Sequence, residues 1–333
     1  MFTRCRALSL ALLTLLASSD ITPEMTSATL ATTYCWERLF DWLPEDTETV
    51  IVAQGPIEIP KPQAEQLKFD EEIRLLPFGP VLSLQDGMLY KQLVGQKVLC
   101  AVEGSRRFTS PRNLGMMPYQ GAHILQFDLG ADGALQKAFR VSQEKAEKNI
   151  ELAGERVAVF TEKLESDMWS FFVSQPQPGV LICATNQVFL EETLKRIGRK
   201  PDRRALPADL PEWKHVDINA RVWAIRHYRK ESAENDPSSP LGPYAGANVP
   251  DPDAVGFVFW YRSEIDKLAH LRYLSGAKNA LELARRDTGG GLTPGIKQVA
   301  PGVVEVAVSV SDEETAPMFL LELQARLGHG LYI

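Results

Sequence analysis

Three residues at the end of one apolar run carry the side chains best suited to catalysis. The run 222–225 is followed by Arg226, His227 and Tyr228, and then by the polar, proline-containing segment 229–253. A histidine can act as a general base near neutral pH, an arginine can stabilise an oxyanion, and a tyrosine can orient a substrate. Irregular connections longer than about 12–15 residues are uncommon in compact domains unless they are functional or disordered. The pattern therefore predicts a candidate hydrolase site at 226–228, beneath the 229–253 loop.

The same residues also fit a purely structural interpretation. Successive side chains of a strand point to opposite faces. Trp223, Ile225 and His227 would then share one face, with Arg226 and Tyr228 on the other. Polar groups at such a strand end can simply anchor the loop that follows. A hydrolase site and a structural strand end therefore both remain open.

The 229–253 loop contains further side chains that could contact a ligand. Tyr244 offers an apolar anchor, and Asp251 and Asp253 offer carboxylates. The loop lacks the alternating carboxylate spacing that binds calcium, and no two histidines of the chain lie two to four residues apart. We therefore predict binding residues at Tyr244, Asp251 and Asp253, and no metal site.

Sequence motifs that bind nucleotides or activate a nucleophile are missing. The chain contains no Gly-x-Ser-x-Gly, no phosphate-binding glycine-rich loop, no Cys-x-x-Cys and no His-Glu-x-x-His. These absences argue against a standard serine hydrolase, a nucleotide-dependent enzyme and a zincin, and we predict no cofactor. The formal net charge of −7 disfavours nucleic acid as a partner, because contacts to backbone phosphates dominate such affinities.

The first residues have the layout of a secretory signal peptide. Arg4 and Arg6 precede the apolar run 7–17, and small residues follow it. The run is shorter than the roughly 20 residues that a helix needs to span a bilayer. No later stretch is long and apolar enough to do so. We therefore predict that residues 1–19 are removed and that the mature protein is secreted or periplasmic, with no membrane span.

The remaining chain reads as two similar halves. A linker rich in Ser, Thr and Ala at 20–33 leads to a first half, 34–200, and a basic, proline-containing stretch opens a second half, 201–333. Each half ends with an apolar strand, a polar cap and an amphipathic helix. Strands come in runs instead of alternating strictly with helices, which favours the α+β class. We predict two diverged units of mainly antiparallel strands with flanking amphipathic helices.

The individual elements follow from the spacing of apolar residues. Helices are predicted at 35–43, 81–95, 136–152, 187–198, 277–287 and 312–328, and Asn186 is the expected cap of the fourth. Strands are predicted at 47–55, 97–104, 121–129, 155–163, 168–175, 179–186, 221–227, 254–264, 268–276 and 303–311.

Three cysteines remain once Cys5 leaves with the signal peptide: Cys35, Cys100 and Cys183. Cys100 and Cys183 lie inside apolar, strand-like runs, which predicts two buried free thiols that behave as small hydrophobic residues. A disulfide between Cys100 and Cys183 is the alternative, because export to an oxidising compartment permits it.

Two segments of the first half resemble a family of uncharacterised exported bacterial proteins. They are LFDWLPEDTETVIVAQGP (39–56), in which Leu-Pro-x-Asp-Thr opens a strand, and GVLICATNQVFLEETLKR (179–196), in which a strand, Ala-Thr-Asn and a helix follow one another. The resemblance covers about the first 200 residues. It implies export and repeated α+β units, and it transfers no catalytic residue.

These patterns together predict an exported, non-catalytic protein that binds or scaffolds another component of the bacterial envelope, a partner whose identity the sequence leaves unknown. The alternative is a hydrolase with His227 as general base, Arg226 as oxyanion stabiliser and Tyr228 as the residue that orients the substrate.

The signal peptide can be tested directly. Because a charged start, a short apolar run and small residues form a complete signal, the mature protein should begin near Asp20. N-terminal sequencing of exported material is the measurement, and a chain that still begins at Met1 would contradict the prediction.

Overall fold

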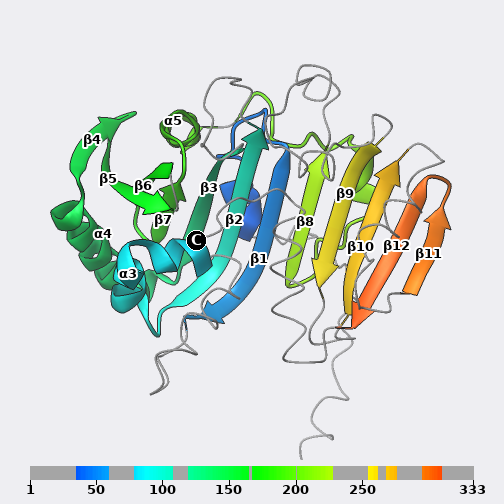
Figure 1. Cartoon of the computed structure of the whole chain (residues 1–333), viewed down its shortest axis with the longest axis horizontal. Coiled ribbons are helices and arrows are strands. Elements are labelled where there is room, and N and C mark those ends of the chain that lie inside the picture. The colour runs from blue at the N-terminus through cyan, green and yellow to red at the C-terminus, as the bar shows by residue number, and fades with distance from the viewer. Residues whose placement is uncertain are drawn as a thin grey trace, which may run out of the picture. The chain divides into compact units, whose positions relative to one another are not determined.

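Among the described residues of the compact unit Tyr34–Ile333, twelve antiparallel strands form one continuous sheet (Figure 1). The computed structural model describes residues 35–59, 79–107, 119–164, 167–199, 201–227, 254–261, 268–275 and 295–309. The strands with a few helices confirm the predicted α+β class. Within these ranges, no helix combines the length and the apolar character needed to cross a membrane.

The strands follow one another in the sheet in the order β11-β12-β10-β9-β8-β1-β2-β3-β7-β6-β5-β4. Their bounds are β1 Thr49–Glu58, β2 Lys97–Arg107, β3 Tyr119–Phe127, β4 Lys148–Leu152, β5 Glu155–Leu164, β6 Asp167–Gln177, β7 Val180–Ala184, β8 Val222–His227, β9 Ala254–Tyr261, β10 Leu268–Ser275, β11 Gly295–Ala300 and β12 Val303–Ser309. Strand β1 pairs with β8, so residues of the predicted first and second halves hydrogen-bond in one sheet. That the two halves are copies of one unit stays a prediction.

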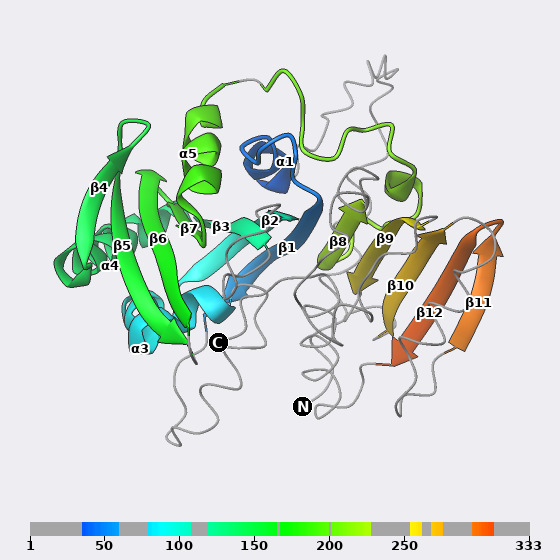
Figure 2. The same ribbon diagram turned by 45° about the horizontal axis from the view of Figure 1, so that its top comes forward.

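Four described α-helices pack against strands that precede residue 200 (Figures 1 and 2). They are α1 Cys35–Phe40, α3 Gly79–Leu93, α4 Asp132–Lys145 and α5 Gln187–Arg196, and the short 3₁₀ turns are η1 Leu129–Ala131 and η2 Pro211–Lys214. The Asn186 side chain accepts hydrogen bonds from the backbone N–H groups of Val188 and Phe189, which confirms it as the cap of α5.

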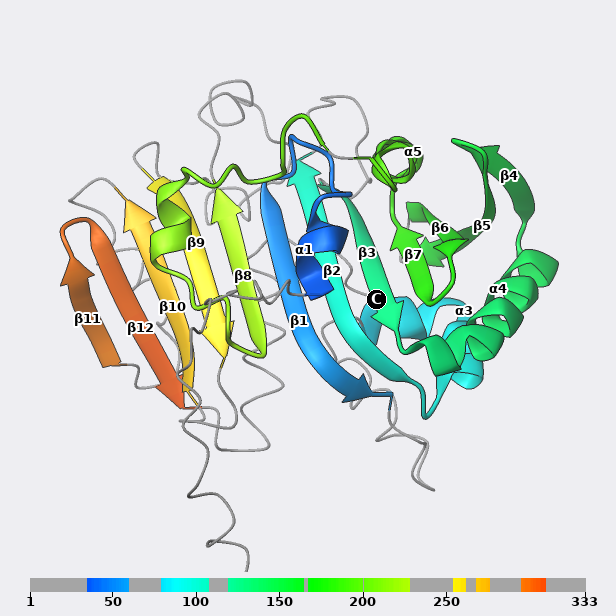
Figure 3. The same ribbon diagram turned by 180° about the vertical axis from the view of Figure 1, so that it is seen from behind.

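The alternation of side chains along the strands divides the core between the two faces of the sheet. On one face, which we call the α1 face, buried residues of α1 and α5 pack against strand residues such as Val52, Ile124 and Trp223. On the opposite face, the α3 face, buried residues of α3 and α4 pack against others such as Ala53 and Leu125. Figure 3 shows α1 and the segment that contains η2 on the same side of the sheet.

Two elements differ from the sequence prediction. The helix predicted at 136–152 ends at Lys145, and 148–152 forms β4 instead, because Ala153 and Gly154 adopt positive φ and turn the chain into a hairpin with β5. Strand β11 was not predicted; it pairs with β12 across a turn in which Gly302 has a φ of 71°. The helices predicted at 277–287 and 312–328 lie outside the described residues.

The structure decides between the two predictions for Cys100 and Cys183. Both thiols are free and buried, as predicted. Cys100 belongs to the core on the α1 face, whereas Cys183 belongs to the core on the α3 face. The sheet therefore separates the two sulfur atoms, and the alternative prediction of a bond between them is wrong.

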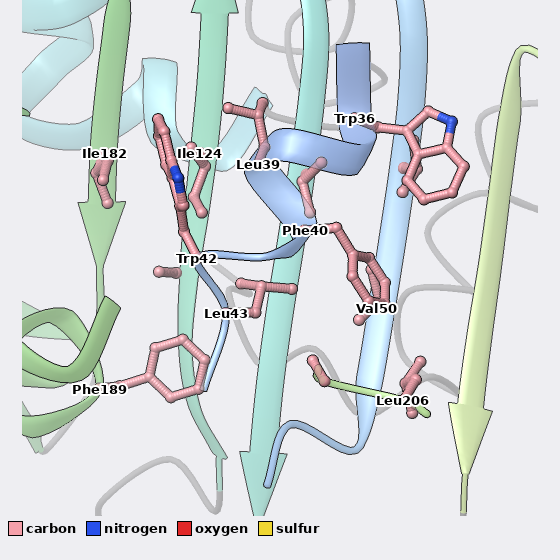
Figure 4. Packing of buried hydrophobic residues seen from close by; sticks show 14 of the residues in the cluster. Trp36, Leu39, Phe40, Trp42, Leu43, Val50, Ile124, Ile182, Phe189 and Leu206 are labelled. Carbon is pink, nitrogen blue, oxygen red and sulfur yellow. The ribbon is translucent and has the colours of Figure 1, made fainter. Parts of the chain in front are cut away.

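The turn after α1 packs onto β2 through a close fit between Leu43 and Gly104. Leu43 is fully buried beside α1 (Figure 4). A Cβ atom added at Gly104 would lie 2.5 Å from Leu43 Cδ2 and 2.7 Å from its Cδ1. Real Cβ atoms do not approach other atoms so closely, so β2 needs glycine at 104 as long as leucine occupies 43.

This fit predicts a non-additive pair of substitutions. Leu43→Ala should lower the free energy of unfolding by about 2–5 kcal/mol, as leucine truncations in cores do. Gly104→Ala should lower it by about 1–3 kcal/mol through overpacking. In the double variant the alanine at 104 occupies part of the space left by Leu43, so the loss should be smaller than the sum of the two.

Denaturant unfolding of the three variants is the measurement. Leu129→Ala is the matched control, because Leu129 is 75% exposed and its truncation should change stability little. Strict additivity of the two losses would contradict the proposed fit.

Candidate functional site

The structure places Arg226 and His227 at the end of β8 on opposite faces of the sheet. His227 follows the alternation of Trp223 and Ile225, which belong to the core on the α1 face. Arg226 follows Val222, which packs against the core on the α3 face, and it is only 5% exposed. The structure therefore does not bring the two predicted catalytic side chains together.

Four other predicted site residues lie outside the described residues: Tyr228, Tyr244, Asp251 and Asp253. The same holds for the 229–253 loop. Their assignment as site residues stays a prediction.

His227 hydrogen-bonds a carboxylate that sequence reasoning missed. Its Nδ1 lies 2.7 Å from Oε1 of Glu212, which is fully buried on η2. The other carboxylate oxygen, Oε2, has no hydrogen-bond partner among the described residues. A histidine whose ring is held by a buried carboxylate has the arrangement of the base and its orienting group in a nucleophilic enzyme. The pair is therefore the strongest catalytic feature on this face.

The local sequence explains how Glu212 reaches β8. Pro211 occupies the first turn of η2, where its missing N–H costs nothing. The next aromatic residue, Trp213, donates its Nε1 hydrogen to the carbonyl oxygens of Leu206 and Pro207, at 3.3 and 3.0 Å. Its ring packs 5.8 Å from that of Trp223. These contacts anchor η2 over β8, and Glu212 is carried inward with it.

A second polar group lies on the α1 face, on β9, β10 and β12, which are the second, third and fourth strands beyond β1. We call it the Trp260 cluster, and it consists of Trp260, His270, Arg272 and Glu305. The strand register places His270 opposite Trp260 and Arg272 opposite Glu305. The rings of Trp260 and His270 stack with centroids 4.9 Å apart, and the Arg272 guanidinium lies 4.7 Å from the Trp260 ring. Arg272 Nε and Nη2 each lie 2.6 Å from Oε2 of Glu305.

His215 connects the Trp260 cluster to η2. Its carbonyl oxygen accepts a hydrogen bond from Arg272 Nη1 at 3.3 Å. Burial, and then the nearby Arg272 charge, lowers the pKa of the His215 imidazole. His215 is therefore favoured in its neutral form. Within the described ranges, no three His, Cys, Asp or Glu side chains are grouped as metal ligands would be.

A third arrangement lies on the α3 face, where a carboxylate, an imidazole and a thiol follow one another across three strands. Glu103 of β2 is opposite His123 of β3, which is opposite Cys183 of β7, and His123 Nδ1 lies 3.5 Å from Glu103 Oε2. This is the order of groups that activates a cysteine nucleophile. Complete burial, however, raises the pKa of the Cys183 thiol. A protonated, shielded thiol is not a nucleophile, so we assign this row to the core.

Comparison with known proteins gives no family. No protein-family model matches the sequence, and no curated protein matches it. Among solved structures, one titled "Structure of crystal form I of TP0453" is similar over 85% of this chain and 96% of that chain, with a TM-score of 0.46 and 11% sequence identity. A similarity at this level says nothing about function, and the resemblance to uncharacterised exported proteins stays a prediction.

Proposed function

We propose that this protein is an exported, non-catalytic protein that binds or scaffolds another component of the bacterial envelope. The observation that carries the proposal is the separation of Arg226 from His227 by the sheet. A hydrolase of the predicted kind needs the oxyanion stabiliser and the base on the same side of its substrate. The alternation along β8 instead places Arg226 and His227 on opposite faces of the sheet.

Recognition of the partner through charged and polar groups fits the described surface. Among the residues whose burial the structure describes, the exposed large hydrophobic ones are Leu129 and Val188, which belong to different elements. In the Trp260 cluster the buried Trp260 ring supports the partly exposed Arg272, and arginine is a residue type enriched at interfaces. Its Arg272 and Glu305 side chains keep 24% and 16% of their surface exposed.

The sheet edge beside the Trp260 cluster extends this surface. Lys297 of β11 lies opposite Glu305 of β12 and is exposed. Strand β11 ends the described sheet order, so its outer backbone groups have no neighbouring strand in that order. An edge strand of this kind can accept an extended segment of a partner. We therefore assign partner binding to β11 and the adjacent Trp260 cluster.

A pair of charge reversals tests this assignment. Lys297→Glu replaces a positive charge with a negative one beside Glu305. Because like charges that meet across an interface cost binding free energy, this variant should capture at least about tenfold less partner from the native envelope than the mature protein does. Lys148→Glu is the matched control, because Lys148 is an exposed lysine on the other edge strand, β4. Lys148→Glu should keep the parent melting temperature, and Lys297→Glu should stay folded with a loss of at most about 1 kcal/mol, because like charges then face each other across β11 and β12.

The captured material is quantified by mass spectrometry. Unchanged capture by Lys297→Glu, or equal losses in both variants, would remove β11 and the Trp260 cluster from the binding surface. Absence of any captured component would contradict the scaffold proposal itself.

The Glu212–His227 hydrogen bond supports a second candidate function, a hydrolase. In that function Glu212 orients the imidazole, Nε2 of His227 acts as general base, and Arg226 takes no part because it faces the other side of the sheet. In the binding protein, the same hydrogen bond ties η2 to the end of β8 and has only a structural role.

Substitutions of this pair separate the two functions. His227→Ala leaves the buried Glu212 carboxylate without its partner, which should cost about 1–3 kcal/mol of stability. His227→Asn places its side-chain amide nitrogen near the position of Nδ1, so it can still donate a hydrogen bond to Glu212 and should retain most of that stability, but it cannot act as a base. If the protein is a scaffold, His227→Asn captures its partner as the parent does.

Hydrolysis of a panel of chromogenic esters and peptides is measured alongside unfolding. Turnover by the parent that disappears in a folded His227→Asn variant would establish the hydrolase and overturn the scaffold proposal. No turnover by either protein, with stability lost only in His227→Ala, is the result that the scaffold proposal expects.

A further inference from the structure

We propose that Cys35 and Cys100 form a redox-active dithiol that closes to a disulfide and so fixes α1 to β2. Cys35 is the first residue of α1, and Cys100 lies in β2. The Cys35 thiol donates a hydrogen bond to the carbonyl oxygen of Leu99, with Sγ 3.6 Å from that oxygen. Leu99 directly precedes Cys100 in the chain, so this contact holds the Cys35 sulfur beside the Cys100 backbone.

The two cysteines lie on the same face of the sheet. Cys100 belongs to the core on the α1 face, and Cys35 packs against that same core. The two thiols are close enough that each shifts the pKa of the other. The third thiol, Cys183, belongs to the core on the other face and cannot compete for either partner.

The environments of the two thiols differ in the way that thiol–disulfide exchange requires. Cys35 is partly exposed, and its hydrogen bond with Cys100 lowers the pKa of its thiol. Cys100 is fully buried, and the same hydrogen bond, together with burial, raises the pKa of its thiol. The thiolate is the nucleophile in exchange, so Cys35 is the attacking group and Cys100 the resolving group.

The reaction takes a disulfide as its oxidant, either a small molecule or a protein of the oxidising compartment. The Cys35 thiolate attacks one sulfur of that disulfide, forms a mixed disulfide and releases the first thiolate. Cys100 then loses its proton and attacks the Cys35 sulfur, which forms the Cys35–Cys100 bond and releases the second thiolate. Two electrons pass from the cysteines to the oxidant, and the two thiol protons end on the two released thiols.

The bond would reinforce a helix whose position depends on tertiary contacts. Helix α1 has six residues, fewer than an isolated helix needs for stability. It nevertheless buries Trp36, Leu39 and Phe40 against the sheet. A disulfide at its first residue closes a long loop of the chain and so restricts the unfolded state strongly. This inference does not depend on the proposed binding function.

Oxidised glutathione provides the test. The reduced mature protein is incubated with it, unreacted thiols are alkylated under denaturing conditions, and tryptic peptides are identified by mass spectrometry. The expected product joins the peptide that ends at Arg38 to the peptide 98–106, with two hydrogens lost, while Cys183 is alkylated. The melting temperature should rise by several degrees on oxidation and fall again with dithiothreitol.

Two variants and one alternative product decide the result. Cys183→Ser should retain both the cross-link and the rise in melting temperature, whereas Cys35→Ser should lose both. A wild-type protein in which Cys35 carries glutathione and Cys100 is alkylated would overturn the proposal, as would any bridge that includes Cys183. The wild-type peptide map distinguishes these products even if Cys35→Ser fails to fold, and capture of an envelope partner plays no part in it.

Discussion

Trp223 has no solvent-exposed surface, and its burial requires segments far apart in the sequence to meet on one face of β8. The ring centroids of Trp36 in α1 and Trp213 in η2 lie 4.9 Å and 5.8 Å from the Trp223 ring centroid, and both contacts are edge-on. Phe40 contacts both of these tryptophans. Aromatic side chains each bury roughly 150–250 Å². Four at one point therefore outweigh the cost of the Trp223 indole N–H, which has no hydrogen-bond partner among the described residues. This aromatic contact fixes where α1 packs on the sheet and where the 201–220 segment crosses it. It also buries the region in which β1 and β8 pair.

The same aromatic contact determines which polar side chains meet on the α1 face of the sheet. Because Trp213 is anchored on Trp223, its neighbour Glu212 is buried against the end of β8 and meets His227. A buried carboxylate is costly unless it is paired, so the η2 segment and His227 stabilise one another. Arg226, the residue before His227, points to the other face because side chains alternate along a pleated strand. Adjacent residues in the sequence therefore serve different environments, and their proximity in the chain is no evidence for a shared site.

The sequence was sufficient for elements whose pattern is local. Apolar spacing located α1, α5 and most strands, and the Asn186 cap follows from side-chain chemistry. It was insufficient where a distant partner decides the outcome: residues 148–152 are polar enough to continue a helix, but pairing with β5 makes them a strand. Glu212 gave no signal because it stands in a proline-containing stretch with no periodicity. The sequence did not predict that Cys35 lies near Cys100, because these residues are far apart in the chain and only the packing of α1 on β2 brings them together.

The arrangement of helices bears on the proposal that recognition involves the second part of the sheet. Helices α1, α5, α3 and α4 pack on both faces of the sheet before residue 200 and enclose polar groups such as Glu103 and His123. Beyond β8, the described cover on the α1 face is the 201–220 segment, and Arg272, Glu305 and Lys297 keep exposed surface. Charges held rigidly by stacking and strand register lose little entropy when a partner binds. Fixed, mixed charges next to a sheet edge therefore support the proposed docking role, whereas turnover needs groups that converge on one atom.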